Sequence, residues 1–192
     1  MGRGVGGFPL PGSQSSILDP RFTMLNTFLQ HPIISRIRRN HGLEHATIHI
    51  LSKNHPGKAI AGHSDAGGFW LIGDLDTEQV RAGVQQALTR MRNGEHKLAV
   101  HPNCGTNFVT SGMAAGLGAV LALFGARRWR DKLYRLPLAM SLATLALIFA
   151  HPLGFLVQER LTTSGHPGDM EIVEIIPTRR GRFKAHRVVT RG

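Results

Sequence analysis

Two long uncharged stretches dominate the pattern of polar and apolar positions along the 192-residue chain. Residues 107–126 and 136–158 contain no Asp, Glu, Lys or Arg, and each is as long as the roughly 20 residues that a helix needs to cross a bilayer. The segment between them, residues 127–135, holds five basic residues, one acid and two aromatic residues typical of a membrane interface. The pattern predicts a transmembrane helical hairpin. Two core helices of a soluble bundle would be expected to keep a polar face, which neither stretch has.

The residues before this hairpin show the periodicity of soluble helices. One helix is predicted over residues 41–52, with Asn40 as its N-cap. A second is predicted over residues 77–93, where Asp76 and Gln79 have the spacing of a capping box and apolar residues follow at helical intervals.

Weaker patterns describe the remaining segments. The apolar run 69–72 predicts a buried strand or part of a hairpin, and the β-branched runs 170–176 and 183–189 predict a C-terminal hairpin. Residues 21–34 fit either a short amphipathic helix on a membrane surface or an ordinary core helix. Residues 1–20, rich in Gly, Pro and Ser, are expected to form a disordered tail and lack the apolar core of a secretory signal.

Together these patterns predict an α+β protein integral to a membrane. A small soluble part of helices and strands is attached to a transmembrane helical hairpin and followed by a C-terminal β-hairpin. The expected parts are a tail, a soluble or interfacial region, the transmembrane hairpin and a basic C-terminal hairpin, with the bounds 1–20, 21–106, 107–158 and 159–192.

The formal net charge of +11 suggests which partners the chain binds. Basic residues cluster in the loop 127–135 and in the C-terminal residues 179–191, so we expect the lipid bilayer and its anionic headgroups as partners. Nucleic acid is the competing partner, but no recognised module or aromatic stacking platform accompanies the charge, which argues against it. A protein partner or a homo-oligomer stays open.

The candidate chemistry begins at His41, where the chain reads H-x-x-E-H. On a helix, His41 and His45 lie one turn apart and can bind one metal ion, while Glu44 can act as a general base on bound water. His49 shares their face and is an alternative ligand, a partner that supports a ligand, or simply an interfacial residue. The spacing alone is a weak indication, because the chain has eleven histidines.

A turn farther along the chain adds two more candidate ligands. His101 and Cys104 lie in a Pro- and Gly-containing turn directly before the first uncharged stretch. Two imidazoles from a helix and an imidazole and a thiolate from a turn suit Zn²⁺, which prefers tetrahedral nitrogen and sulfur ligands. Cys104 is the only cysteine, so an intramolecular disulfide is excluded.

These two motifs resemble the paired signature of the YqhQ-like bacterial membrane proteins, a family of unknown function. In that family H-G-x-E-H-x-T-I-H precedes H-P-x-C-G-T-x-F at the start of a hydrophobic segment, and the same patterns occupy residues 41–49 and 101–108 here. The resemblance covers about residues 40–125. It implies a place in a bacterial inner or plasma membrane and a shared site, but no particular reaction. This chain has one hydrophobic hairpin where those proteins have more, which also fits a shorter sister family.

Two functions fit this candidate site. If His101 does not bind, an open coordination position remains, and the protein is a membrane-anchored zinc hydrolase with Glu44 as base. If His41, His45, His101 and Cys104 all bind, the site is a structural zinc clasp in a membrane scaffold or assembly subunit. A third hypothesis is that these side chains form a hydrogen-bonded polar cluster without a metal. Basic segments argue for both membrane orientations, and a free thiol slightly favours the cytoplasmic side.

Overall fold

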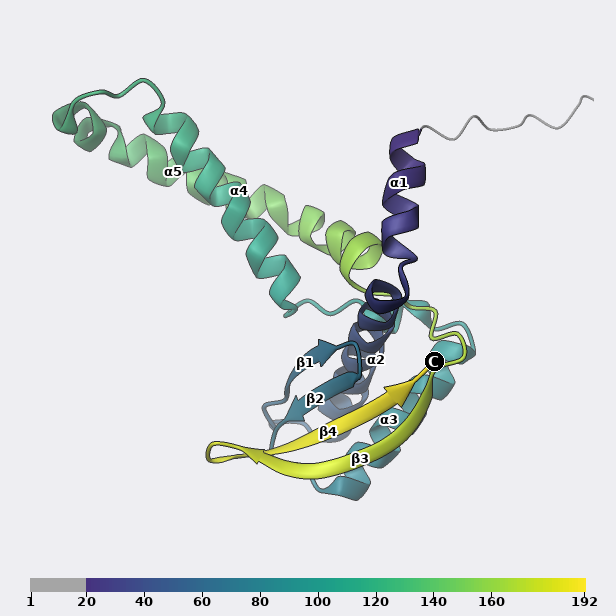
Figure 1. The fold of residues 1–192 in the computed structure, drawn as a ribbon. Helices are drawn as coiled ribbons and strands as arrows, with labels where there is room; N and C mark the ends of the chain where they lie inside the picture. Colours follow the sequence, from purple (N-terminus) through teal and green to yellow (C-terminus); the bar gives the residue numbers. More distant parts are fainter. Residues whose placement is uncertain (1–19) are drawn as a thin grey trace, which may run out of the picture.

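The computed structural model describes residues 20–192, so the expected tail lies outside it except for residue 20. The helices are α1 (Pro20–Leu29), α2 (Pro32–Asn54), α3 (Thr77–Arg92), α4 (Gly105–Leu123) and α5 (Trp129–Val157), with a 3-10 turn η1 (His96–Ala99) and a π-helical turn η2 (Gln158–Thr162). The strands are β1 (Ala61–Asp65), β2 (Gly68–Ile72), β3 (Glu171–Arg180) and β4 (Phe183–Arg191). The predicted α+β class is confirmed: a sheet with helices adjoins a long helical hairpin (Figure 1).

The four strands form one antiparallel sheet in the order β1-β2-β4-β3. The C-terminal hairpin β3-β4 was predicted, but its pairing with β2 was not, and this pairing joins residues more than 100 positions apart, such as Trp70 and Arg187. Helices α2 and α3 cover the sheet (Figure 1), and the core between them contains the fully buried side chains Leu43, Phe69 and Val84. The sheet and α2 therefore form the rigid base of the soluble part.

Helix α2 begins at Pro32, so the prediction that Asn40 caps it is wrong. Proline at the first helical position has a suitable fixed φ and lacks the N–H that would have no partner there. Asn40 instead lies buried in the helix, where its side-chain amide donates to the Asp65 carbonyl (2.8 Å) and its oxygen accepts from the Thr190 hydroxyl (2.6 Å). The residue ties α2 to strands β1 and β4 of the sheet.

Two shorter elements also differ from the expectations. Strand β1 was not predicted as a separate strand, because its sequence Ala-Gly-His-Ser-Asp has no β-branched residue and no apolar alternation. The segment expected at residues 21–34 contains α1 and the start of α2. Met24 and Phe28 of α1 are exposed, which contradicts the core-helix alternative for this segment.

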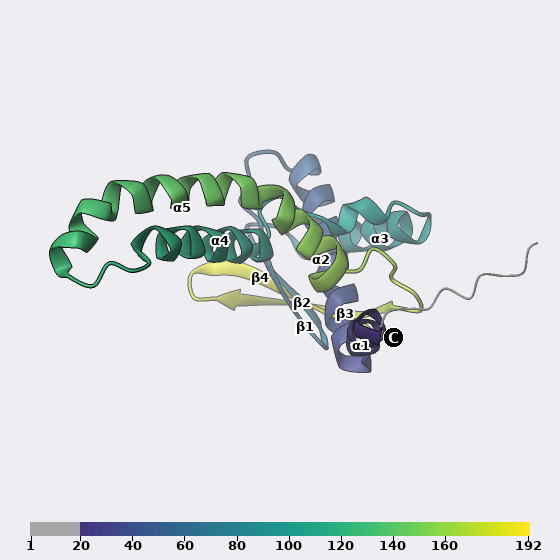
Figure 2. The same cartoon turned by 90° about the horizontal axis from the view of Figure 1, so that it is seen from above.

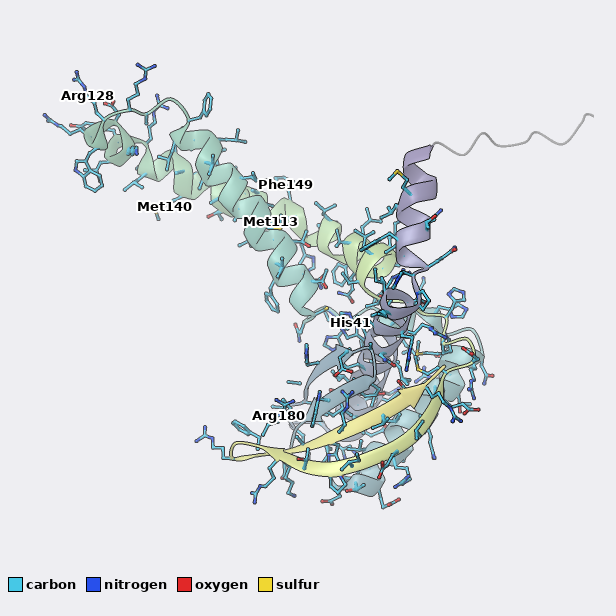
Figure 3. All side chains as sticks on the ribbon, in the orientation of Figure 1. His41, Met113, Arg128, Met140, Phe149 and Arg180 are labelled. Atoms are coloured by element: carbon cyan, nitrogen blue, oxygen red, sulfur yellow. The ribbon has the colours of Figure 1, made fainter. Side chains whose placement is uncertain are left out.

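Helices α4 and α5 form an antiparallel pair that extends away from the sheet (Figures 1 and 2). Both are long and apolar enough to cross a membrane. Figure 3 shows Met113, Met140 and Phe149 on their outer surface, where each is more than 60% exposed. The basic loop is shorter than predicted, because α5 already begins at Trp129. The Asp131 side chain caps this start by accepting a hydrogen bond from the Arg128 N–H.

Candidate metal centre

Three of the predicted ligands converge where α2 meets the start of α4. His41 and His45 lie one turn apart on α2, and Cys104 is the residue that precedes α4. Their ligand atoms all lie within 4.8 Å of one another, and Cys104 Sγ is 3.4 Å from His41 Nε2. Zinc bonds of about 2.0–2.3 Å place tetrahedral ligands about 3.5 Å apart. The spacing therefore fits a single ion held between the three side chains.

Backbone carbonyls fix the tautomer of both histidines. His45 Nδ1 lies 2.7 Å from the Ala99 carbonyl oxygen, and His41 Nδ1 lies 3.0 Å from the Thr162 carbonyl oxygen. Because a carbonyl can only accept, each Nδ1 must carry the proton, which leaves the lone pair on Nε2. Metal-binding histidines are commonly oriented by such an outer hydrogen bond. Both rings are thus prepared to bind through Nε2.

The third ligand, Cys104, is a buried thiol at the N-terminus of α4. Burial alone would raise its pKa, but hydrogen bonds with His45 and Thr106 outweigh burial and bring the pKa of the Cys104 thiol below its ordinary value. The thiolate is the form that binds metals, so this environment favours the ligand state.

The turn that carries Cys104 is held by two buried amides, which the sequence analysis did not identify. Gln158 accepts from the His101 N–H and donates to the His101 carbonyl (3.1 Å), and Asn107 donates to the carbonyls of His101 and Pro102 (3.2 and 2.9 Å). Gln158 also donates to Asn107 (3.1 Å). The turn is thereby fixed to both apolar helices, and no sequence signal indicated this network.

Glu44 lies beside the three ligands and is only 4% exposed. Burial raises its pKa above the ordinary value, although a hydrogen bond from Ser64 and the nearby His41 and His63 act in the opposite direction. The Ser64 hydroxyl donates to Glu44 Oε2 and orients the carboxylate from strand β1. Ser64 is a further site residue that sequence reasoning missed.

The three ligands, Glu44 and Ser64 all line one cavity of about 860 Å³. Its walls are α2, β1, the turn before α4 and the η2 segment after α5. The predicted site residues that line it are His41, Glu44, His45, His101 and Cys104. The apolar part of the lining is formed by Ile34, Ile37, Ile48, Ile60 and Leu161. The cavity has room for a substrate next to the ligands.

His101 and His49 do not join the group of converging ligand atoms. His101 Nδ1 accepts from the Asn103 N–H (3.2 Å), and its ring centroid is 5.6 Å from that of His45. Burial, followed by the nearby His49 and His45, lowers the pKa of His101 to about 4. His49 donates from Nε2 to the Val100 carbonyl (2.9 Å). Three of the four predicted ligands are therefore brought together.

The comparisons with known proteins place the chain in a family without giving it an activity. No solved structure matches it. An uncharacterised protein from the cyanobacterium Picosynechococcus sp. is 32% identical over 142 residues, which cover 67% of this chain and 66% of that relative, just under two thirds of its length. The YqhQ-like name stays a sequence-based prediction. A profile described as a domain of unknown function, DUF6391, matches residues 36–175, so the chain belongs to the DUF6391 family.

Proposed function

We propose that this protein is a membrane-embedded zinc-dependent hydrolase in which His41, His45 and Cys104 hold the metal and Glu44 is the general base. The observation that carries the proposal is the convergence of three ligand atoms within 4.8 Å, beside a buried carboxylate in one cavity. Catalytic zinc sites have three protein ligands and an open position, whereas structural sites have four protein ligands.

The donor set supports zinc as the metal. Two imidazole nitrogens and one thiolate combine borderline and soft ligands, which suit zinc and do not suit magnesium or calcium. When bound, zinc activates a water molecule and polarises the bond to be cut. The carbonyls of Ala99 and Thr162 keep both rings in the binding tautomer, so little reorganisation accompanies binding.

Glu44 is suited to proton transfer by its burial. A carboxylate with a raised pKa is a stronger base than one in water, and general bases work best when their pKa approaches the working pH. Glu44 would take a proton from the attacking water and return it to the leaving group. Ser64 holds one carboxylate oxygen, which leaves the other free for this transfer.

The exposed apolar surface of α4 and α5 supports insertion in a bilayer. Only 17% and 11% of the most apolar 18-residue stretch of each helix is buried within the protein, which favours membrane helices over core helices of a soluble bundle. Basic residues at 127–135 and 179–191 would bind anionic lipid headgroups. We place the site on the cytoplasmic side of a bacterial membrane, because a free thiol ligand survives best in a reducing compartment.

A structural zinc clasp is the second candidate, and one observation favours it. The histidines lie on α2, while Cys104 directly precedes α4, so an ion held by all three would fasten the soluble part to the apolar hairpin. Such a clasp needs a fourth protein ligand and has no use for a base. A Glu44 variant therefore distinguishes the two candidate functions, because only the hydrolase needs this carboxylate.

The test is elemental analysis and activity of detergent-purified protein. Wild type and Glu44→Gln are expected to carry about one zinc each, and His45→Ala and Cys104→Ser to lose it. Glu174→Gln, an exposed carboxylate on β3, is the matched control for Glu44→Gln. Ester, phosphomonoester and peptide substrates are then offered to each protein.

The outcomes separate the candidates. Hydrolysis that is lost in Glu44→Gln and kept in Glu174→Gln supports the hydrolase. Zinc without hydrolysis of any substrate supports the clasp. Folded and metal-free wild-type protein would overturn both.

A further inference from the structure

Strand β1 is an unpaired edge of the sheet beside the metal centre. Among the strands of residues 20–192, β2 pairs with one side of β1 and no strand pairs with the other. Within residues 20–192, no backbone hydrogen bond joins residues 61–64 to any element other than β2. Ala61, Gly62 and His63 are exposed. An edge of this kind presents N–H and C=O groups that can pair with another chain.

The cavity borders the backbone edge of β1 and not merely one of its faces. Side chains alternate between the two faces of a strand, so a strand that lines a cavity with one face contributes every second residue. Here the five consecutive residues 60–64 all line the cavity. Gly62 and Ser64 face Glu44 on α2, whereas His63 lies on the opposite face. The edge between these faces therefore opens into the cavity.

In an antiparallel pair, hydrogen-bonded and non-hydrogen-bonded positions alternate along each strand. Every second residue of β1 therefore points its backbone N–H and C=O away from β2. These groups lie in the same cavity as His41, His45 and Cys104. Glu44 is bonded to β1 through Ser64. The free edge and the metal centre are therefore two parts of one site.

We propose that the substrate is a polypeptide segment that binds in an extended conformation as an additional strand along β1, with the bond to be cut facing the three ligands. The inference rests on the proposed hydrolase. Main-chain pairing with a free edge gives affinity for extended peptides, and pockets for alternate side chains give specificity. Ile37, Ile48 and Leu161 supply an apolar surface for such side chains.

The reaction is peptide hydrolysis. Glu44 takes a proton from water as the water oxygen forms a bond to the carbonyl carbon. The C–N bond then breaks, and Glu44 delivers that proton to the leaving nitrogen. The products are a carboxylic acid and an amine. The five residues of β1 can pair with a segment of similar length.

The first experiment compares substrate classes with the zinc-loaded full chain in detergent. A quenched fluorescent decapeptide library, a chromogenic ester and a chromogenic phosphomonoester are offered. Cleavage of peptides is expected. Cleavage of the ester or phosphomonoester alone would overturn the peptide proposal and leave the hydrolase intact, whereas zinc binding without any cleavage would overturn the hydrolase itself.

The second experiment tests the pairing on the substrate, so protein folding is not at issue. In analogues of a cleaved peptide, one backbone N–H at a time, away from the cut bond, is replaced by oxygen. We expect kcat/KM to fall about fivefold at alternate positions, the effect of one lost hydrogen bond, and less than about twofold at the positions between them. A uniform or absent effect would overturn strand pairing.

Hydrogen exchange provides a direct readout on the protein. The zinc-loaded Glu44→Gln variant is mixed with the same peptide, which it binds and does not cut. Exchange at alternate amides of β1 should slow at least about tenfold, as expected for amides that gain a hydrogen bond. Strand β3, the other edge of the sheet, is the internal control. Slowing at both edges or at neither would overturn the proposal.

Discussion

The contact between Gly62 and Glu44 allows a sharp test of the site's construction. A Cβ atom on Gly62 would lie 2.2 Å from Glu44 Oε1, 2.6 Å from Cδ and 2.7 Å from Cγ. At separations below 3.0 Å one of the two groups must shift, and here the group that can shift is the Glu44 side chain. Glu44 is buried and bonded to Ser64, so the carboxylate cannot move without losing that bond. We expect Gly62→Ala to displace Glu44 and leave the three metal ligands in place.

The expected loss follows from two contributions. Overpacking a buried contact costs about 1–3 kcal/mol, and breaking a hydrogen bond to a charged group costs about 1.5–3 kcal/mol. Because the displaced carboxylate finds some new contacts, we expect a total of about 2–4 kcal/mol. For a chain of this size that lowers Tm by about 5–15 °C. A misplacement of the base by about 1 Å lowers kcat by about 100-fold, with the zinc content unchanged.

A double-mutant cycle measured by thermal unfolding isolates this contact. The three nearest atoms to the new Cβ all belong to Glu44. In a Glu44→Ala background they are absent, so Gly62→Ala should cost almost nothing there. Gly116→Ala on α4, where the added Cβ meets no atom within 4 Å, is the control and should not lower Tm. An equal loss in both backgrounds would refute the reasoning, since strain in β1 itself would then be the cause.

Three further predictions concern other parts of the molecule. The hydrogen bonds from Arg187 to Asp65 (2.7 and 2.8 Å), partly offset by burial, hold the pKa of Asp65 below its ordinary value. The stability that this pair contributes is present above the ordinary pKa of an Asp side chain and is lost as pH falls through the lowered pKa. Asp65→Asn should therefore destabilise most at pH 7 and progressively less as the pH falls below about 4, the ordinary pKa of Asp. An equal loss at pH 7 and at low pH would contradict this. In Gly118→Ala the new Cβ would lie 2.8 Å from a backbone carbonyl of α5, so Tm should fall, and an unchanged Tm would show that α4 and α5 do not pack as closely in the membrane. A reporter enzyme fused after Gly192 should be active in the cytoplasm. Reporter activity outside the cell would reverse the proposed orientation.

The local pattern of the sequence was sufficient for several elements. Apolar spacing and the capping box of Asp76 located α3 to within one residue. The two uncharged stretches located α4 and most of α5. The spacing of His41 and His45 placed both rings on one face, and the turn before α4 brought Cys104 to them. For the helices and the two histidines, the interaction that decides the structure lies within a few residues or along one helix, whereas the approach of Cys104 joins residues 63 positions apart.

The remaining features depend on contacts between distant segments. Asn40 has the residue type of an N-cap, but its partners Asp65 and Thr190 are 25 and 150 residues away. Strand β1 is weakly patterned and is held by β2. The carbonyls of Ala99 and Thr162 that orient the histidines belong to the backbone, which any residue type supplies. Sequence alone cannot reveal such partners.

His101 decides between an open and a closed metal site. Its Nδ1 accepts from the Asn103 N–H, so in the neutral ring the proton is on Nε2, and neither nitrogen is free to bind an ion. Binding through Nε2 would require the other tautomer and the loss of the Asn103 bond. His41 and His45 need no such change. The hydrolase therefore predicts that His101→Ala keeps its zinc with less than about a tenfold change in affinity, whereas a clasp with four ligands predicts a far larger loss. Competition of the purified variant with a chelating dye measures the difference, and a loss as large as that of Cys104→Ser would show that the site is closed.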